Sequence, residues 1–112
     1  MKIVYVAGPF EGANAWESEL NVRRAEEIGL AVAEAGAVPV VPHTMYKFYG
    51  VFGQAFWLQC GVTLLGRCDA ILLFGQWEAD SSTYIQVKEA ERLSLDRFTD
   101  SDFDMLRAWA RR

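Results

Sequence analysis

Residues 2–10 read KIVYVAGPF, an apolar run that stops at Gly8-Pro9. An uninterrupted apolar run is typical of a parallel strand covered on both faces, and glycine followed by proline ends such a strand. Apolar residues then recur every three or four positions over about residues 15–35, which predicts an amphipathic helix that ends at Gly36. Residues 37–41 form a second apolar strand. Strand, helix and strand in this order predict a right-handed parallel crossover.

The alternation continues along the chain. Residues 44–53, TMYKFYGVFG, have no clean period and predict a loop that folds over a site. Residues 69–75, DAILLFG, predict a third strand, and residues 83–93 predict a third helix. Between the loop and the third strand we expect another helix, along which apolar residues step by four: Phe56, Cys60 and Leu64.

The last part of the chain leaves two interpretations open. Residues 95–98 form either a short edge strand or a turn, before a last helix over Phe103, Leu106 and Trp109. In both cases we predict one α/β domain over residues 1–112, a small doubly wound parallel sheet of the flavodoxin-like or Rossmann-like kind with helices on both faces. Such sheets bind ligands outside the carboxyl ends of their strands. The segments expected around this crevice are residues 8–11, 42–48 and 75–83.

Composition and charge exclude several classes of protein. The net charge is −4 and no run of Lys or Arg is present, so polymeric DNA or RNA is not an expected partner. The first residues lack the features of a signal peptide, and no apolar run approaches the roughly 20 residues of a membrane span. Two cysteines and one histidine, without a CxxC pair, argue against a disulfide framework and a metal site. We therefore expect a soluble protein of the reducing cytoplasm.

Two segments at the predicted crevice carry candidate binding groups. Gly8, Pro9 and Phe10 form a turn whose backbone N–H groups can hold a phosphate or a sugar hydroxyl, and the alternative is a turn that only ends the strand. His43 follows the second strand, where it can donate a hydrogen bond to a phosphate or act as an acid or base near neutral pH. Its alternative role is structural.

A third segment, residues 77–83 (WEADSST), concentrates acids and hydroxyls before a helix. Helix capping alone accounts for this composition, because Thr83 with Gln86 three residues later fits a capping box. Asp80, Ser81 and Ser82 also suit a helix N-terminus. Asp69, which opens the third strand, has a simple alternative role as a turn residue.

Several blocks occur in an order that resembles the nucleoside 2-deoxyribosyltransferase-like superfamily, and most of all its short bacterial and phage members of unassigned function. The resemblance covers roughly residues 2–95. The blocks are VYVAGPF at 4–10, Asn21 with Arg24-Ala25, Val41-Pro42-His43, LGRCDA at 65–70 and DSSTYIQVKEA at 80–90. Order and spacing together are the stronger signal.

In that superfamily the last block reads D-S-G-T-x-x-E, and its glutamate is the nucleophile that attacks the anomeric carbon. Here Ser82 replaces the glycine and Gln86 replaces the glutamate. The resemblance further implies that Asp80 positions or protonates the leaving base and that Tyr5 hydrogen-bonds the nucleophile. The expected catalytic positions are thus Gln86, Asp80 and Tyr5. The expected substrate-binding positions are Gly8, Pro9, Phe10, His43, Asp69, Trp77, Ser81, Ser82 and Thr83.

The resemblance implies cleavage or transfer at the N-glycosidic bond of a nucleoside or nucleoside 5′-monophosphate, without a metal or organic cofactor. It also implies a homodimer or larger homo-oligomer, with the aromatic loop and the helix of Trp109 as contacts. A neutral amide is a poor nucleophile, so this form is inactive or weakened unless Glu78, Asp80 or Glu89 takes over. The alternative from another class is a non-catalytic nucleotide-binding module. A flavodoxin-like electron carrier is disfavoured, because the first turn lacks a hydroxyl-rich phosphate loop.

Overall fold

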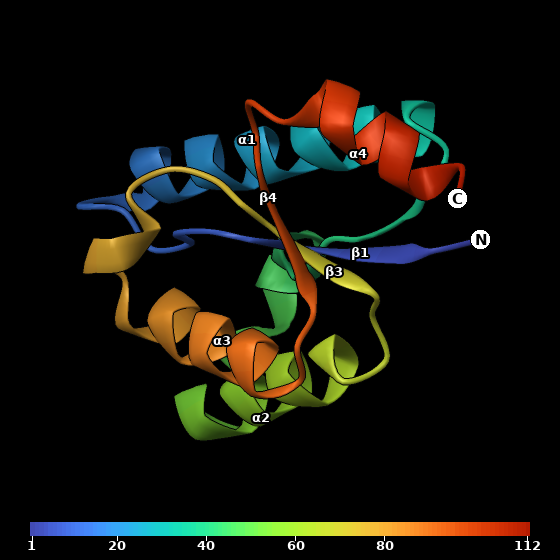
Figure 1. The fold of residues 1–112 in the computed structure, drawn as a ribbon. Helices are drawn as coiled ribbons and strands as arrows, with labels where there is room; N and C mark the ends of the chain where they lie inside the picture. The colour runs from blue at the N-terminus through green and yellow to red at the C-terminus, as the bar shows by residue number, and fades with distance from the viewer.

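One four-stranded sheet forms the centre of the computed structural model, which describes all residues from 1 to 112. Its strands lie in the order β2-β1-β3-β4, and every neighbouring pair is parallel (Figure 1). The strands are β1 (Ile3–Ala7), β2 (Val38–Val40), β3 (Ala70–Leu73) and β4 (Asp96–Thr99). The predicted α/β parallel sheet is confirmed, and of the two interpretations of the tail the edge strand is the correct one.

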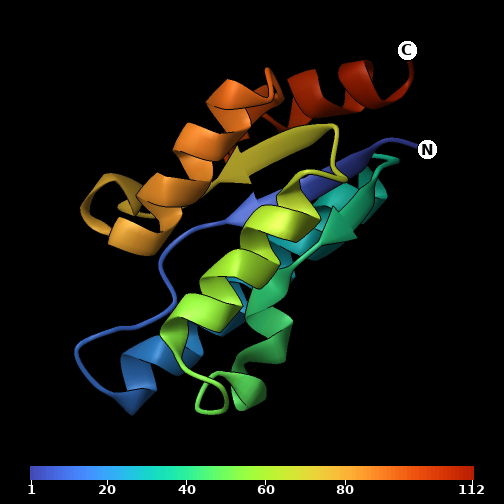
Figure 2. The ribbon, with the colours of Figure 1, turned by 90° about the horizontal axis from the view of Figure 1, so that it is seen from below.

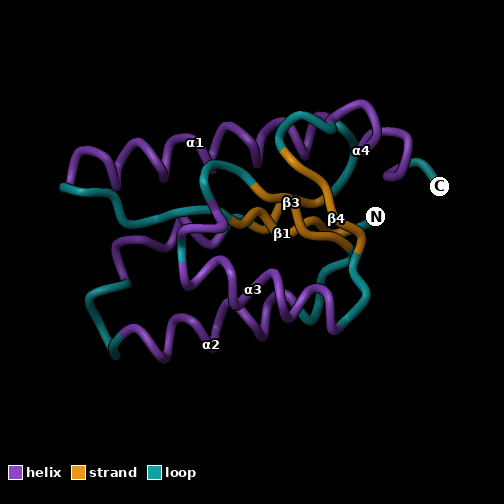
Figure 3. Tube along the Cα trace, turned by 60° about the vertical axis from the view of Figure 1, so that its left-hand side comes forward, coloured by secondary structure: helices purple, strands orange, loops and turns teal.

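Helices cover both faces of this sheet, as in a doubly wound fold. The α-helices are α1 (Ala15–Glu34), α2 (Gln54–Leu65), α3 (Ser81–Arg92) and α4 (Phe103–Ala110). Two 3₁₀ segments, η1 (Pro42–Phe48) and η2 (Trp77–Ala79), precede α2 and α3. Helices α1 and α4 lie on one side of the sheet and α2 and α3 on the other (Figure 3). Figure 2 looks onto the α2 and α3 layer, with β1 and β3 behind it.

The two faces of the central strands explain the apolar run at the start of the chain. Successive side chains of a strand point to opposite faces. Val4 and Val6 therefore join the core beneath α1 and α4, while Tyr5 and Ala7 join the core beneath α2 and α3. Tyr5 is 1% exposed. The alternation thus places the Tyr5 side chain in the layer between the sheet and α2 and α3.

Two segments differ locally from the prediction. Residues 42–48 form the 3₁₀ helix η1, so the first half of the loop predicted over residues 44–53 is helical. Pro42 lies in its first turn, and the Thr44 N–H donates to the Val41 carbonyl over 3.0 Å. Helix α3 begins at Ser81, and its N-cap is Asp80 rather than Thr83. The expected Thr83–Gln86 capping box is therefore wrong, because Thr83 is already the third residue of the helix.

The expectation about the apolar stripe of α2 is also corrected. Phe56, on the expected apolar stripe of α2, is 46% exposed, whereas the buried residues of this helix are Gly61 and Leu65. Trp109, on the last helix, is 5% exposed. Its ring packs edge-on against Phe98 at 5.2 Å. None of the helices is both long and apolar enough to cross a membrane.

Candidate functional site

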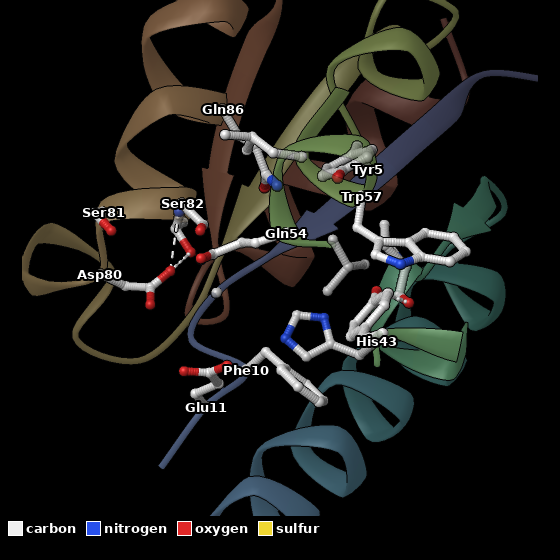
Figure 4. Close-up of a pocket in the computed structure, with 16 residues that line it drawn as sticks. Tyr5, Phe10, Glu11, His43, Gln54, Trp57, Asp80, Ser81, Ser82 and Gln86 are labelled. Atoms are coloured by element: carbon white, nitrogen blue, oxygen red, sulfur yellow. Dashed lines mark hydrogen bonds between the residues drawn. The ribbon is translucent and has the colours of Figure 1, made fainter. Parts of the chain in front are cut away.

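A pocket of about 260 Å³ opens at the carboxyl end of β1, beside the first turn of α3 (Figure 4). This volume lies just below the ~300–1,000 Å³ typical of small-molecule sites. Its walls come from β1 and the turn after it, from η1, from α2 and from the start of α3. The lining residues are Tyr5, Val6, Gly8, Phe10, Glu11, Pro42, His43, Tyr49, Gln54, Trp57, Leu58, Asp80, Ser81, Ser82, Thr83 and Gln86.

Tyr5 and Gln86 meet in this pocket through the absence of a side chain on Gly61. A Cβ built on Gly61 would lie 2.8 Å from the Tyr5 hydroxyl and 3.1 Å from Gln86 Nε2. Figure 4 shows the two side chains directed toward one another from β1 and α3. Glycine at position 61 therefore lets α2 approach the sheet while both polar groups keep their places.

The Tyr5 hydroxyl is buried and has no hydrogen-bond partner in the chain. Burial raises the pKa of Tyr5 far above its usual value, with smaller contributions from Tyr49 and Cys68. The phenol is therefore protonated at neutral pH and available as a donor. An unpaired buried donor is costly, so a functional explanation is warranted.

Asp80 is held by the start of the helix that it caps. Its Oδ2 accepts hydrogen bonds from the Thr83 backbone N–H at 2.9 Å and from the Thr83 hydroxyl at 2.5 Å. The carboxylate thereby satisfies one of the N–H groups that a helix start leaves without an intrahelical partner. Capping fixes the Asp80 side chain at the pocket wall.

His43 is a buried, neutral wall of the same pocket. Its Nε2–H donates to the Pro9 carbonyl at 3.0 Å. Burial lowers the pKa of His43, an effect partly offset by the backbone hydrogen bonds of Pro9 and Gly8 and by the charge of Asp80. His43 therefore ties the strand-ending turn to η1 and carries no charge at neutral pH.

The turn after β1 is held at both of its ends. Asn21 Nδ2 donates to the Phe10 carbonyl at 3.0 Å. At the other end a Cβ on Gly8 would lie 2.4 Å from the ring of Phe74, so only glycine fits there. These contacts keep the turn close to the sheet and hold Phe10 at the pocket.

Aromatic rings form one side of the pocket. Phe10 and Tyr49 pack edge-to-face with their centroids 4.9 Å apart, and Tyr49 lies 5.5 Å from Trp57. The Tyr49 hydroxyl donates to the Pro42 carbonyl, which fixes its ring. Burial raises the pKa of Tyr49, with a smaller contribution from Cys60. Flat aromatic surfaces of this kind suit a planar ligand ring.

Most of the residues expected from the sequence meet in this pocket. Three do not line it. Pro9 contributes its carbonyl to His43. Asp69 lies at the amino end of β3, where its Oδ2 accepts from the Ile3 backbone N–H at 2.7 Å. Trp77 lies in η2, with its ring 4.9 Å from the Arg97 guanidinium. Those that line it are Tyr5, Gly8, Phe10, His43, Asp80, Ser81, Ser82, Thr83 and Gln86.

Of the three acids that could replace Gln86 as the nucleophile, two lie outside the pocket and one lies in it. Glu78 is exposed in η2, and Glu89 pairs with Arg92; neither lines the pocket. Asp80 does. The pocket also contains Glu11, at the end of the expected turn, and no three His, Cys, Asp or Glu side chains in the chain form a group that could hold a metal ion.

The α2 contribution to the pocket was not predicted. Gln54, Trp57 and Leu58 line the pocket, yet α2 follows no strand end directly. The sequence signal before α2 is Gly53. In the structure its φ is 86°, a conformation that glycine adopts readily, and it forms a tight turn into the helix. That signal indicates a turn and not a ligand.

The chain matches the model of a known protein family. A family model described as "Domain of unknown function (DUF7768)" matches residues 2–97. This range includes all four strands apart from the last two residues of β4, and all the pocket residues. No curated protein matches the chain.

Proposed function

Because the chain belongs to the family described as Domain of unknown function (DUF7768), we propose its function from the pocket itself. The protein binds a nucleoside or nucleoside 5′-monophosphate and holds its N-glycosidic bond beside Gln86. The observation that carries this proposal is that the Tyr5 hydroxyl and the Gln86 amide both lie beside Gly61, while the buried Tyr5 hydroxyl has no hydrogen-bond partner in the chain. A donor in that place suits a negatively charged or polar atom at position 86 or on the ligand.

The aromatic side of the pocket supports a base-containing ligand. Phe10, Tyr49 and Trp57 offer ring faces and edges to a planar heterocycle. Ser81, Ser82 and Gln54 offer hydroxyl and amide groups to sugar hydroxyls. A nucleoside and its 5′-monophosphate share both of these parts.

Position 86 decides the chemistry of such a site. A carboxylate there would attack the anomeric carbon while the bond to the base breaks and its electron pair moves to the base nitrogen. Asp80, with one oxygen held by Thr83, is one of two carboxyl groups in the pocket, and in its protonated form it can pass a proton to the leaving base. Water would then displace the carboxylate and release the sugar.

Gln86 cannot form that intermediate, because an amide nitrogen or oxygen is a weak nucleophile. We therefore expect the protein to bind substrate and to release base slowly. Restoring the carboxylate with Gln86→Glu should increase base release by on the order of 10³-fold.

A second candidate function is a non-catalytic nucleotide-binding module. The amide of Gln86 at this position favours it, since the pocket keeps its aromatic and hydroxyl groups without the nucleophile. Such a module would bind the same ligands and release no base in either form.

Chromatography of base release separates these possibilities. The protein and its Gln86→Glu variant are incubated with a panel of nucleosides and their 5′-monophosphates. Gln54→Glu is the matched control, because it adds the same charge to another glutamine of the same pocket. Base release by Gln86→Glu alone supports the glycosidic proposal.

Three other outcomes of this experiment would count against the glycosidic proposal. Binding by both forms without base release favours the binding module. Equal activity of Gln86→Glu and Gln54→Glu would contradict the assignment of position 86. Absence of binding to every nucleoside and nucleotide of the panel would overturn the proposed function.

A further inference from the structure

The charge balance of the pocket distinguishes between the ligands that its shape would accept. Among its 16 lining residues are two carboxylates, Glu11 and Asp80, and no lysine or arginine. Neither carboxylate takes part in any of the ion pairs of the chain. The imidazole of His43 adds no positive charge, because burial lowers its pKa. The pocket is therefore negative as well as aromatic.

The start of α3 is the helix N-terminus at this pocket, and it already holds a carboxylate. Helix N-termini attract negative charge through their free N–H groups and the helix dipole. Here Asp80 caps the helix, and its carboxylate accepts from the Thr83 N–H and hydroxyl. A phosphate at this position would lie beside a carboxylate without a counter-ion, and like charges at close range repel.

The aromatic side of the pocket favours the opposite charge. Aromatic faces carry partial negative charge and attract cations within about 6 Å of the ring centre. Phe10, Tyr49 and Trp57 line the pocket together with the two carboxylates. Rings beside acids, with no cation, form an arrangement that suits a flat, positively charged heterocycle.

We propose that this pocket selects nucleosides whose base carries a positive charge and whose 5′-hydroxyl is free, and that Glu11 is a specificity-determining residue for that charge. The inference rests on the proposed function, since it narrows which nucleosides the pocket binds. Glu11 is the more informative of the two acids, because it is exposed and makes no capping bond whose loss would disturb the fold.

Calorimetric titration at physiological salt tests this with three probes of nearly the same shape. They are N-ribosylnicotinamide, whose pyridinium ring is cationic, its neutral 1,4-dihydro form, and the 5′-monophosphate of the cation. We expect the cationic nucleoside to bind at least about tenfold more tightly than the other two, as close charge pairs in a partly shielded site do. Adenosine and thymidine are titrated in parallel.

Variants locate the origin of the preference. Glu11→Gln should reduce the preference for the cation about three- to tenfold with little effect on the neutral form. Glu34→Gln removes the same charge at the exposed carboxyl end of α1, outside the pocket, and should leave the preference unchanged. An equal effect of both variants would overturn the role of Glu11.

The two proposals fail in different ways. If the neutral form binds as tightly as the cation, or if the monophosphate binds best, the charge selection is overturned while the proposed function stands. If adenosine and thymidine bind and the cation does not, the same conclusion follows. If no nucleoside of any charge binds, the proposed function is overturned and the charge selection with it.

Discussion

The hydroxyl of Tyr5 and the side-chain amide of Gln86 share one small space, against the backbone of Gly61 on α2. Tyr5 comes from β1, Gln86 from the second turn of α3 and Gly61 from α2, so this place lies where the sheet meets both helices of one layer. The arrangement couples the fold of the layer to the chemistry of the pocket. Substitutions at these three positions should therefore distinguish effects on stability from effects on ligand binding.

Gly61→Ala should destabilise the protein. Its Cβ would lie within 3.1 Å of both polar groups, and overpacking of this kind costs about 1–3 kcal/mol. Alanine is otherwise favoured over glycine in a helix by about 1 kcal/mol. Urea unfolding measures the balance, with Gly50→Ala as the control, since no neighbour lies within 4 Å of a Cβ there. A Gly61→Ala protein as stable as the original would show that the two side chains can move apart.

Tyr5→Phe should leave the free energy of unfolding unchanged or raise it by up to about 1 kcal/mol, because the lost hydroxyl has no partner. The same variant should weaken nucleoside binding. Tyr49→Phe is the comparison: its hydroxyl donates to the Pro42 carbonyl, and its loss should cost about 1 kcal/mol. Urea unfolding and ligand titration are measured on both. A Tyr5→Phe variant that loses stability and keeps full binding would contradict the role assigned to this hydroxyl.

Asp80→Ala should lower the free energy of unfolding by about 0.5–2 kcal/mol, because it removes the N-cap of α3. Asp80→Asn keeps a side-chain oxygen in place and should retain most of that stability. The control is Ser81→Ala, since the Ser81 hydroxyl makes no hydrogen bond within the chain and its loss should have little effect. Thermal or urea unfolding of the three variants gives the order of their stabilities. Equal losses for alanine and asparagine at position 80 would mean that charge, and not capping, dominates.

His43 should make stability depend on pH. Its folded pKa lies below its ordinary value of 6.5, because burial disfavours the charged ring. Above that value both the folded and the unfolded forms are neutral, and His43 has no effect. As pH falls below it, the unfolded chain binds a proton first, so the folded state progressively loses stability.

The measurement compares the protein with His43→Gln, whose amide can still donate to the Pro9 carbonyl. Between about pH 7.5 and about pH 5 the original protein should lose more stability in urea unfolding than the variant. The carboxyl groups titrate in both proteins, so their effect on stability cancels in the comparison. Parallel stability curves over this range would show that His43 does not titrate differently on folding.

Local patterns in the sequence were sufficient for most of the fold. The run at residues 2–7 is apolar at every position after Lys2 because β1 is covered on both faces, and α1 keeps a regular apolar spacing because only one of its faces meets the sheet. The parallel order then implied that residues 8–11, 42–48 and 75–83 meet at one edge. Three segments of the pocket could thus be predicted from strand ends alone.

Which side of α2 is buried against the sheet could not be predicted in this way. Apolar residues occur nearly all round this helix, so their spacing does not decide which side is buried. The buried side is set by Gly61, whose missing side chain accommodates Tyr5 and Gln86. The stripe with Phe56 faces outward for the same reason, and Trp57 and Gln54 enter the pocket.

The sequence by itself determined the sheet, its helices and the edge at which ligand groups gather, because strand and helix periodicities are local and the crossover rule orders them. The tertiary structure alone decided which polar residues reach that edge. Asp69 accepts from the Ile3 N–H, 66 positions away, at the opposite end of the strand, and Trp109 of α4 donates to Asp96 of the edge strand β4. Such pairings depend on contacts between distant segments, and no local pattern encodes them.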